Sequence, residues 1–365
     1  MKIAIVRGDF LSAWEIPIFE PLTKHHDVTL FLGLKPVYKV PIPKSFKIVN
    51  LPCPVDLNFG KINRYLMAIL NRVFIDAHVL FGLVWKLRGY DVAYTAETFY
   101  FFTFQCILAK KLGFIKKVAM HVGENIAFNN EGIWGRRFLK QVAIKNTDVF
   151  ICITNQAKDV LILEGADPKK IVRADPGIDL TLFNQIKDPA SKRGDSIKLL
   201  VVSRLVPEKG IEEILNAFKY LRKKYQSLKL VVVGTGPEST KLNGQDDVML
   251  YDRLSQKELV KLYNDCDIFV HYPKGSKTWI EQYGFVLIEA MACGLPVVAL
   301  DKGSIKEVVG SGGLVVNKES FQESLEKLVK DRKIRLAYSQ KAIDYAKKNY
   351  NVMDYSARLE AVITS

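Results

Sequence analysis

Short runs rich in valine and isoleucine alternate with longer segments of helical periodicity along nearly the whole chain. When a helix separates two strands, it carries the chain back across the sheet, so the second strand runs parallel to the first. Runs such as 197–202, in which β-branched residues dominate, have the length and composition of strands. The alternation therefore predicts an α/β fold built on parallel sheets.

The periodicity also predicts how the chain is divided. We expect strands at 2–6, 28–32, 92–95, 118–121, 149–153, 197–202, 229–233, 248–250, 268–271, 296–300 and 314–316. We expect helices at 16–24, 62–88, 101–112, 135–146, 156–163, 210–225, 256–265, 285–293, 320–330 and 335–348. Residues 186–195 are polar and interrupted by proline and glycine, which favours a linker. A chain of 365 residues is long enough for two domains, and we expect Rossmann-like domains at 1–187 and 188–350. Ligands in such sheets bind at the carboxyl ends of the strands.

Composition narrows the class of protein. The five cysteines, at positions 53, 106, 152, 266 and 293, show neither zinc-site spacing nor a disulfide framework. Such usage fits a reducing cytosol. The apolar run at the N-terminus is shorter than the core of a signal peptide, and no stretch approaches the roughly 18–20 apolar residues of a spanning helix. We therefore expect a cytoplasmic protein, either free or peripheral at the inner face of a membrane.

The positive charge of the chain is concentrated in its first part. The formal net charge is +14, and residues 1–150 contribute 20 Lys and Arg against 11 Asp and Glu. Solvated surface lysines are one interpretation, and a face that meets anionic lipid or an anionic acceptor is another. Segments 62–88 and 98–117 combine aromatic, apolar and basic residues, which suits either a buried helix or contact with a membrane surface. The chain has no Gly/Arg tract and no RNA- or DNA-binding motif, so no nucleic-acid partner is expected.

Two glutamates, Glu281 and Glu289, lie on either side of Gly284. A helix is expected over 285–293, because a glycine suited to a helix end and then a proline follow directly. Glu281 then precedes the helix and Glu289 lies inside it. The free N–H groups and partial positive charge of the helix start suit a phosphate. A carboxylate further along suits the vicinal hydroxyls of a sugar.

Paired carboxylates also occur in glycosidases, where they stand roughly 5–9.5 Å apart. Two acids at i and i+8 on one helix would be about 12 Å apart by rise alone. The glycine between them interrupts the helix, so spacing leaves their separation open. Incidental acids in an amphipathic segment are the remaining interpretation.

A second polar segment, Ser203-Arg204-Leu-Val-Pro-Glu-Lys209-Gly, follows one predicted strand and opens a helix. A lysine at a helix start opposes the helix dipole, and an anionic ligand beside Lys209 would relieve that conflict. The glycines Gly234 and Gly236 end the next predicted strand, where they permit a tight turn or a close approach to a ligand.

Taken together, these segments resemble the signatures of retaining glycosyltransferase family 4, also called glycosyltransferase group 1. The segment 281–289 is similar to the E-x7-E motif, and 203–210 to G-R-L-x-x-x-K-G with serine in place of the usual first glycine. The stretches 234–237 and 175–179 are similar to two further family motifs. The resemblance weakens toward the N-terminus. It implies a GT-B fold, in which two Rossmann-like domains face a central cleft and residues 351–365 form a helix that returns to the first domain.

The resemblance also implies a reaction. A hexose-type sugar would pass from a nucleotide-diphosphate sugar to a glycan, lipid-linked or small-molecule acceptor with retention of configuration. Arg204 and Lys209 would hold the pyrophosphate, because cations stabilise the charge that grows on this leaving group. Glu289 would bind the ribose, Glu281 would lie beside the transferred sugar, and His121 would orient the sugar and the acceptor.

The remaining positions implied by the resemblance contact the donor largely through the backbone. They are Gly8 after the first strand, Gly234 and Gly236 beside the nucleotide, Arg253 and Leu254 beside the base, and Tyr283, Gly284, Phe285 and Val286 at the sugar and phosphate. Gly8 stands alone where family members often have two glycines. We assign no role to the other histidines, which occupy positions 25, 26, 78 and 271.

One further expectation concerns metals, and two alternative functions stay open. Asp265-Cys-Asp267 matches the metal motif of a different glycosyltransferase fold, but helix capping explains these acids, so no metal and no other cofactor is expected. A sugar-nucleotide epimerase or hydrolase would share the fold and act on the donor without an acceptor. A non-catalytic subunit would keep the nucleotide contacts and show no turnover.

Overall fold

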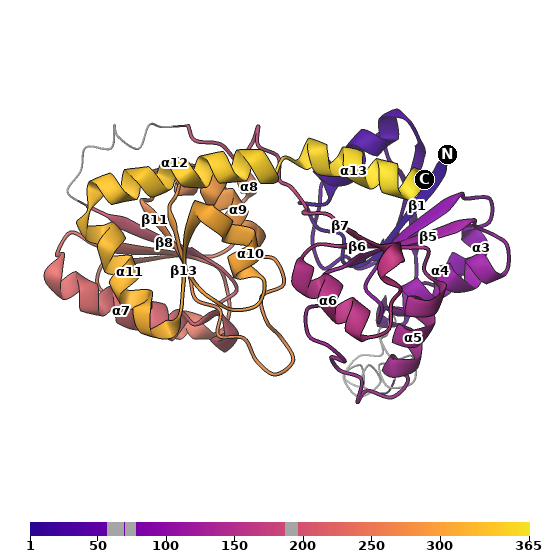
Figure 1. Ribbon diagram of the computed structural model, residues 1–365, viewed down its shortest axis with the longest axis horizontal. Coiled ribbons are helices and arrows are strands. Elements are labelled where there is room, and N and C mark those ends of the chain that lie inside the picture. The colour runs from indigo at the N-terminus through magenta and orange to yellow at the C-terminus, as the bar shows by residue number, and fades with distance from the viewer. Residues whose placement is uncertain (57–68, 70–77, 187–195) are drawn as a thin grey trace. The chain divides into compact units, whose positions relative to one another are not determined.

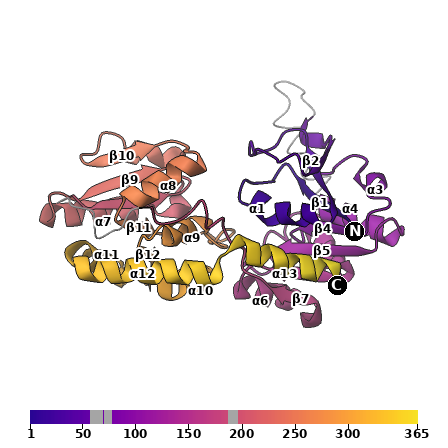
Figure 2. The same cartoon turned by 90° about the horizontal axis from the view of Figure 1, so that it is seen from above.

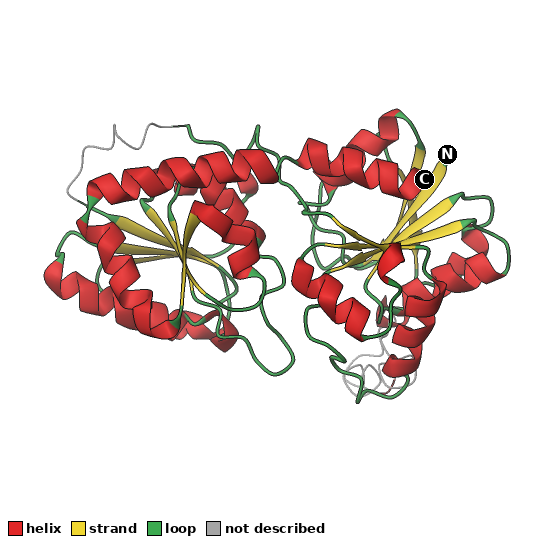
Figure 3. Cartoon of the chain, in the orientation of Figure 1, coloured by secondary structure: helices red, strands yellow, loops and turns green. Residues whose placement is uncertain are grey.

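The computed structural model describes residues 1–56, 69, 78–186 and 196–365. The chain divides into two compact units, of which the first comprises Met1–Gly177 and Val352–Ser365 and the second Ile178–Asn351. In each unit a central sheet is flanked by helices (Figures 1 and 3). The division falls before the boundary expected at 187/188. The expected linker, 186–195, lies outside the described residues from position 187 onward.

The first unit contains a seven-stranded sheet in which every pairing is parallel, with the order β3-β2-β1-β4-β5-β6-β7. The strands are β1 (Lys2–Gly8), β2 (Asp27–Gly33), β3 (Lys47–Leu51), β4 (Val92–Ala96), β5 (Lys117–Val122), β6 (Val149–Cys152) and β7 (Ile171–Arg173). The sequence did not predict β3 and β7. Both lie at the edges of the sheet, where one side has no neighbouring strand to bury apolar residues, and β3 is largely exposed.

Helices cover the two faces of this sheet. Helices α3 (Leu83–Lys86), α4 (Phe101–Lys111), α5 (Arg136–Asn146) and α6 (Asn155–Leu163) pack against one face through a single apolar cluster. Helices α1 (Ile16–Phe19) and α13 (Val352–Thr364) contribute to the cluster on the other face and contact each other (Figure 2).

Two predicted helices of this unit differ from the structure. The helix expected at 16–24 is α1 followed by a 3₁₀ turn, Glu20–Lys24, in which Pro21 occupies the first turn. A proline has no N–H to donate back along the chain, so the α-helical ladder ends there. The helix expected at 62–88 lies mostly outside the described residues, and 78–82 are not helical, which leaves α3 at its end.

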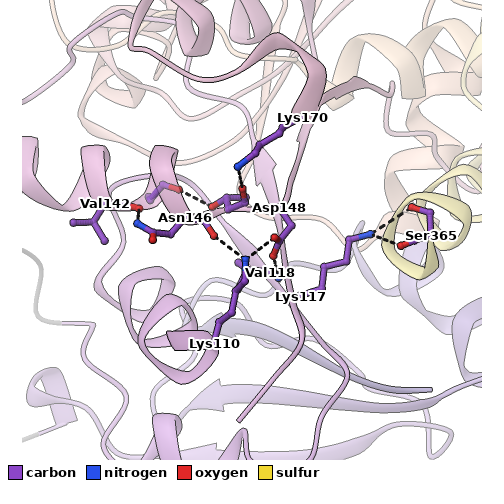
Figure 4. Close-up of polar contacts among 10 residues, drawn as sticks. Lys110, Lys117, Val118, Val142, Asn146, Asp148, Lys170 and Ser365 are labelled. Atoms are coloured by element: carbon purple, nitrogen blue, oxygen red, sulfur yellow. Dashed lines mark hydrogen bonds and ion pairs between the residues drawn. The ribbon is translucent and has the colours of Figure 1, made fainter. Parts of the chain in front are cut away.

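Helix α13 is tied to the amino-terminal edge of this sheet. The Lys117 ammonium donates to the carbonyl oxygen of Val362 at 2.8 Å. It also donates to that of Ser365 at 3.2 Å (Figure 4). Beside it, the Asp148 carboxylate accepts from Lys110 at 2.5 Å and from the Val118 N–H at 2.8 Å. A cation near the carbonyl end of a helix is favoured by the helix dipole, so these contacts hold the last turn of α13.

The second unit has a six-stranded parallel sheet with the order β10-β9-β8-β11-β12-β13. Its strands are β8 (Lys198–Val202), β9 (Lys229–Val233), β10 (Val248–Tyr251), β11 (Ile268–His271), β12 (Val297–Leu300) and β13 (Gly313–Val316). Its helices are α7 (Ile211–Lys224), α8 (Gln256–Asp265), α9 (Phe285–Ala292), α10 (Ile305–Val309), α11 (Lys318–Lys330) and α12 (Arg332–Asn349). Of these, only α10 was not predicted. Within the described residues, no helix has the length and hydropathy needed to cross a bilayer.

Candidate active site

The loops of the second unit that follow β8, β9 and β11 meet because these strands are neighbours in the sheet. The Leu205 N–H donates to the Thr235 carbonyl at 2.8 Å. A Cβ on Gly234 would stand 1.8 Å from the Ser203 carbonyl oxygen, and one on Gly236 2.3 Å from that of Leu205. Both glycines also have positive φ. These two positions therefore require glycine so that the β8 and β9 loops can pack together.

The loop after β8 also packs against the loop after β11. Lys209 ends a short 3₁₀ turn, and Gly210 follows with φ +64° and leads into α7. A Cβ on Gly210 would lie 2.2 Å from the Tyr272 carbonyl oxygen. This close approach holds the residue after Lys209 against the loop that follows β11.

Lys209 points to Glu281, and a histidine joins the pair. The Lys209 Nζ atom lies 2.5 Å from Glu281 Oε2, and the His271 Nε2 atom lies 3.0 Å from the same oxygen. An ionised carboxylate can only accept hydrogen bonds, so His271 Nε2 is the donor. Burial raises the pKa of Glu281, but the hydrogen bond and charge of His271 and the charge of Lys209 outweigh it and lower the pKa to about 2. The cluster is therefore an ionised carboxylate held by two donors.

The sequence predicted no role for His271, but the structure places this residue in the cluster with Glu281 and Lys209. It is the last residue of β11 and only 2% exposed. The available signal was a single histidine at the carboxyl end of an otherwise apolar strand, the edge where ligands bind in parallel sheets.

Trp279 lies over the cations of the β8 loop. Its ring centroid is 4.4 Å from Lys209 Nζ and 6.0 Å from the guanidinium carbon of Arg204. An aromatic face attracts cations, so Trp279 holds both side chains on the same side of the loop. Arg204 is exposed, whereas Lys209 is largely buried.

The expected helix after Gly284 is confirmed as α9, Phe285–Ala292. Gly284 has φ +80°, no side chain caps the helix start, and the first turn contains no acid. Glu289 is 9% exposed, and the Tyr263 hydroxyl donates to its Oε2 at 2.8 Å. Burial raises the pKa of Glu289 to about 7, against the opposing effect of that hydrogen bond. Tyr263, which had no predicted role, is its partner here.

The other predicted residues of this unit vary in exposure. Tyr283 is buried, and its ring lies 4.9 Å from that of Phe285. Phe285 and Val286 are half-buried in the first turn of α9. After β10, Arg253 is exposed and Leu254 is half-buried.

In the first unit, the predicted residues lie at the carboxyl edge of the sheet. Gly8 ends β1 with φ +54°, and His121 lies near the end of β5. Burial, together with the charge of Arg7, lowers the pKa of His121 to about 3, so this imidazole is neutral at physiological pH. Arg7 itself pairs with the buried Glu15 at 2.7 Å. A neutral imidazole can donate with one nitrogen and accept with the other.

Glu97 also lies at this edge and was not predicted. It directly follows β4 with φ +57°, a backbone conformation that is unusual for glutamate. The Gly123 N–H donates to its Oε1 at 2.8 Å, and its N–H donates to the His121 carbonyl at 2.8 Å. Burial raises the pKa of Glu97 to about 7. Unusual backbone angles and shifted carboxylates gather at functional sites, and Glu97 shows both beside His121.

Asp265 and Asp267 are the pair that resembles a metal motif. Asp265 is the last residue of α8, and Asp267 directly precedes β11, where its carboxylate accepts from the Lys198 N–H at 2.9 Å. Across the residues that the structure describes, no group of three or more His, Cys, Asp or Glu side chains could hold a metal ion.

Comparisons with known proteins indicate the class of protein to which this chain is similar. Residues 183–348 match the family model of the glycosyl transferases group 1. An uncharacterised glycosyltransferase of Methanocaldococcus jannaschii is 24% identical over 381 residues, which cover 96% of this chain and 91% of the relative. The D-inositol 3-phosphate glycosyltransferase of Stackebrandtia nassauensis is 28% identical over 235 residues, 57% of this chain and 52% of the relative. The match thus spans about half the length of this second relative.

Solved structures show the same fold. The Anabaena protein HepE, solved in complex with UDP and glucose, superposes with a TM-score of 0.73 at 17% identity, and the match covers 100% of both chains. An Escherichia coli protein named for trehalose-6-phosphate and bound with UDP-2-fluoro glucose gives a TM-score of 0.71 at 13% identity, and the match covers 100% of this chain and 99% of that one.

The two parallel sheets and the similarity to these solved structures give the chain the GT-B fold, in which each sheet forms a Rossmann-like domain. The matched segment 183–348 and the named relatives identify the chain as a glycosyltransferase that is similar to the glycosyl transferases group 1.

Proposed function

We propose that this protein transfers a hexose-type sugar, with retention and without a metal, from a nucleotide-diphosphate sugar to a glycan, lipid-linked or small-molecule acceptor. The observation that carries the proposal is the Lys209–Glu281–His271 cluster beside Arg204 at the carboxyl ends of β8 and β11. Two cations suit a diphosphate, and an ionised carboxylate suits sugar hydroxyls. UDP is the first nucleotide to test, since UDP or a UDP sugar occupies the two solved structures compared above.

The proposed roles follow from the chemistry of the groups. Lys209 and Arg204 stabilise the negative charge that develops on the diphosphate as the anomeric bond breaks. The Lys209 charge is already balanced by Glu281, which keeps the ammonium in place before the donor arrives. Glu281, whose Oε2 is held by Lys209 and His271, lies beside the transferred sugar. Glu289 binds the ribose, and the N–H groups at the start of α9 meet the phosphate.

In the first unit, His121 and Gly8 contact the transferred sugar and the acceptor. The relative named for inositol 3-phosphate supports a polyol among the acceptors to test. A lipid-linked acceptor would bring the enzyme to the inner face of a membrane.

A thermal-shift panel in EDTA tests the donor site, with UDP, GDP, ADP, CMP, dTDP and their common sugar conjugates. A ligand at 100 times its Kd stabilises the folded state by about 2.7 kcal/mol, so one nucleotide is expected to raise Tm by several degrees without metal. A response that requires added Mg²⁺ or Mn²⁺ would contradict metal independence. A panel without any response would contradict the donor site. Consumption of the donor at full rate without an acceptor would instead indicate a hydrolase or epimerase.

His271 provides a test of how the cluster is held. Replacing His271 with phenylalanine keeps a planar ring but removes the donor to Glu281, and a hydrogen bond to a charged group contributes about 1.5–3 kcal/mol. We expect His271→Phe to lower kcat/KM tenfold or more, measured with the sugar conjugate of the nucleotide that the panel selects. His271→Gln, which retains a donor, is expected to recover part of the loss. Equal losses in both variants, tracking their Tm, would show that His271 only supports folding.

A further inference from the structure

Exposed large apolar side chains concentrate in the first unit. Among the described residues of the second unit, those strongly exposed are Ile186, Tyr220 and Tyr251. The first unit instead exposes a set on the helical layer formed by α3, α4 and α5 and the turns that precede or follow these helices. This set, here called the α3–α5 face, consists of Phe81, Trp85, Leu108, Leu112, Trp134 and Phe138. Trp85 and Trp134 are 69% and 73% exposed.

These side chains share one side of the first unit. Helices α3, α4 and α5 pack on the same face of the sheet through one core cluster, so their outer surfaces point away from it together. Helix α4 contacts both α3 and α5, and the three lie next to one another in Figure 1. The rings of Phe104 on α4 and Phe138 on α5 are 6.4 Å apart. The exposed residues therefore form one surface rather than isolated points.

The same surface is strongly basic. Residues 79–90, 98–123 and 132–147 contain lysines and arginines but no aspartate or glutamate. The exposed cations are Lys86, Arg88, Lys111, Lys116, Arg137 and Lys145. Of the five acids that border these segments, three pair with cations: Asp91 with Lys116, Asp148 with Lys110, and Glu131 with Lys140. The other two, Glu97 and Glu124, follow the carboxyl ends of β4 and β5. An excess of positive charge is therefore left on the face.

We propose that the α3–α5 face docks on an anionic lipid bilayer. Tryptophan and phenylalanine side chains settle at the level of the headgroups, and lysines and arginines attract anionic lipid. Stable attachment without a spanning segment needs both signals, and this face supplies both. Part of it, 98–117, was named from the sequence as a basic aromatic segment, whereas the contribution of α5 comes from the structure. The proposal does not depend on the identity of the donor or the acceptor.

Co-sedimentation of the full chain with vesicles tests the proposal. We expect binding to phosphatidylcholine vesicles that contain phosphatidylglycerol, little binding to phosphatidylcholine alone, and release by NaCl. Trp134→Ser with Phe138→Ser is expected to weaken binding about tenfold or more, because two apolar anchors are lost. Arg137→Glu is expected to weaken it at least fivefold, since each cation near an anionic surface contributes on this order. Tyr220→Ser, which removes an exposed aromatic from the second unit, should leave binding unchanged.

A second measurement identifies the contact directly. Brominated lipid should quench the tryptophan fluorescence of the bound protein, and Trp134→Phe should bind normally but show less quenching. Absence of binding at low salt would overturn the proposal, as would binding that none of the α5 variants weakens. Self-association of the lipid-free protein that the same variants abolish would instead identify the face as a protein interface.

Discussion

Replacing Lys209 with alanine is expected to lower kcat/KM by about 100-fold or more. Losing one preorganised group that stabilises transition-state charge has this order of effect. Lys209 is only 11% exposed and lies 2.5 Å from Glu281, so its ammonium is fixed before a substrate arrives. The measurement is steady-state transfer of the sugar, or hydrolysis of the donor if no acceptor is known, with the nucleotide selected by thermal shift.

Two controls accompany this prediction. Lys223→Ala removes an exposed lysine from the last turn of α7, the helix that follows the Lys209 loop, and should leave turnover unchanged. Lys209→Arg keeps the charge in a different shape and should retain part of the activity. The Tm of each variant shows whether the loss reflects folding, because Lys209→Ala also leaves Glu281 with one donor fewer. Turnover near that of the unmodified protein would refute the role of Lys209.

Replacing Lys140 with methionine is expected to destabilise the protein by about 3–5 kcal/mol, the cost of breaking a buried ion pair from one side. The Lys140 side chain is 1% exposed, pairs with Glu164, and lies 3.4 Å from Glu131. Glu164 also accepts from the Phe128 N–H at 2.7 Å. The substitution therefore leaves a buried carboxylate without its cation and loosens the loop that follows β5. Thermal and urea unfolding measure the loss.

The matched control is Lys145→Met, an exposed lysine on the same helix, for which a change within about 0.5 kcal/mol is expected. A double substitution, Lys140→Met with Glu164→Gln, should recover much of the lost stability, because no unpaired charge then stays buried. A single Lys140→Met variant as stable as the unmodified protein would mean that water or another group compensates Glu164.

Much of the fold follows from local patterns. The parallel α/β architecture and the start of α9 after Gly284 were predicted, because strand and helix periodicity and the conformational preferences of glycine and proline act over a few residues. Elements with a weak local signal were missed. β7 has three residues, β3 is an exposed edge, and the five-residue α10 is shorter than a typical helix.

The residues of the candidate site were likewise predicted only in part. Motifs in the second half of the chain pointed to Lys209 and Glu281 separately, but no pattern linked either to His271. Lys209 and Glu281 are 72 positions apart in the chain. They meet because β8 and β11 are neighbours in the sheet, although β9 and β10 lie between them in the sequence.

What the sequence determined by itself is the class of fold and the segments where a ligand can bind, since strand ends, helix starts and glycine turns are set by nearby residues. Tertiary structure alone decided which charges are paired and which surfaces stay exposed. The sharing of one Glu281 oxygen by Lys209 and His271, the buried partners of Lys140 and the exposure of Trp134 all depend on strand order and helix packing. Those contacts join residues far apart in the chain, and burial, which sets their electrostatic strength, is a property of the packed molecule.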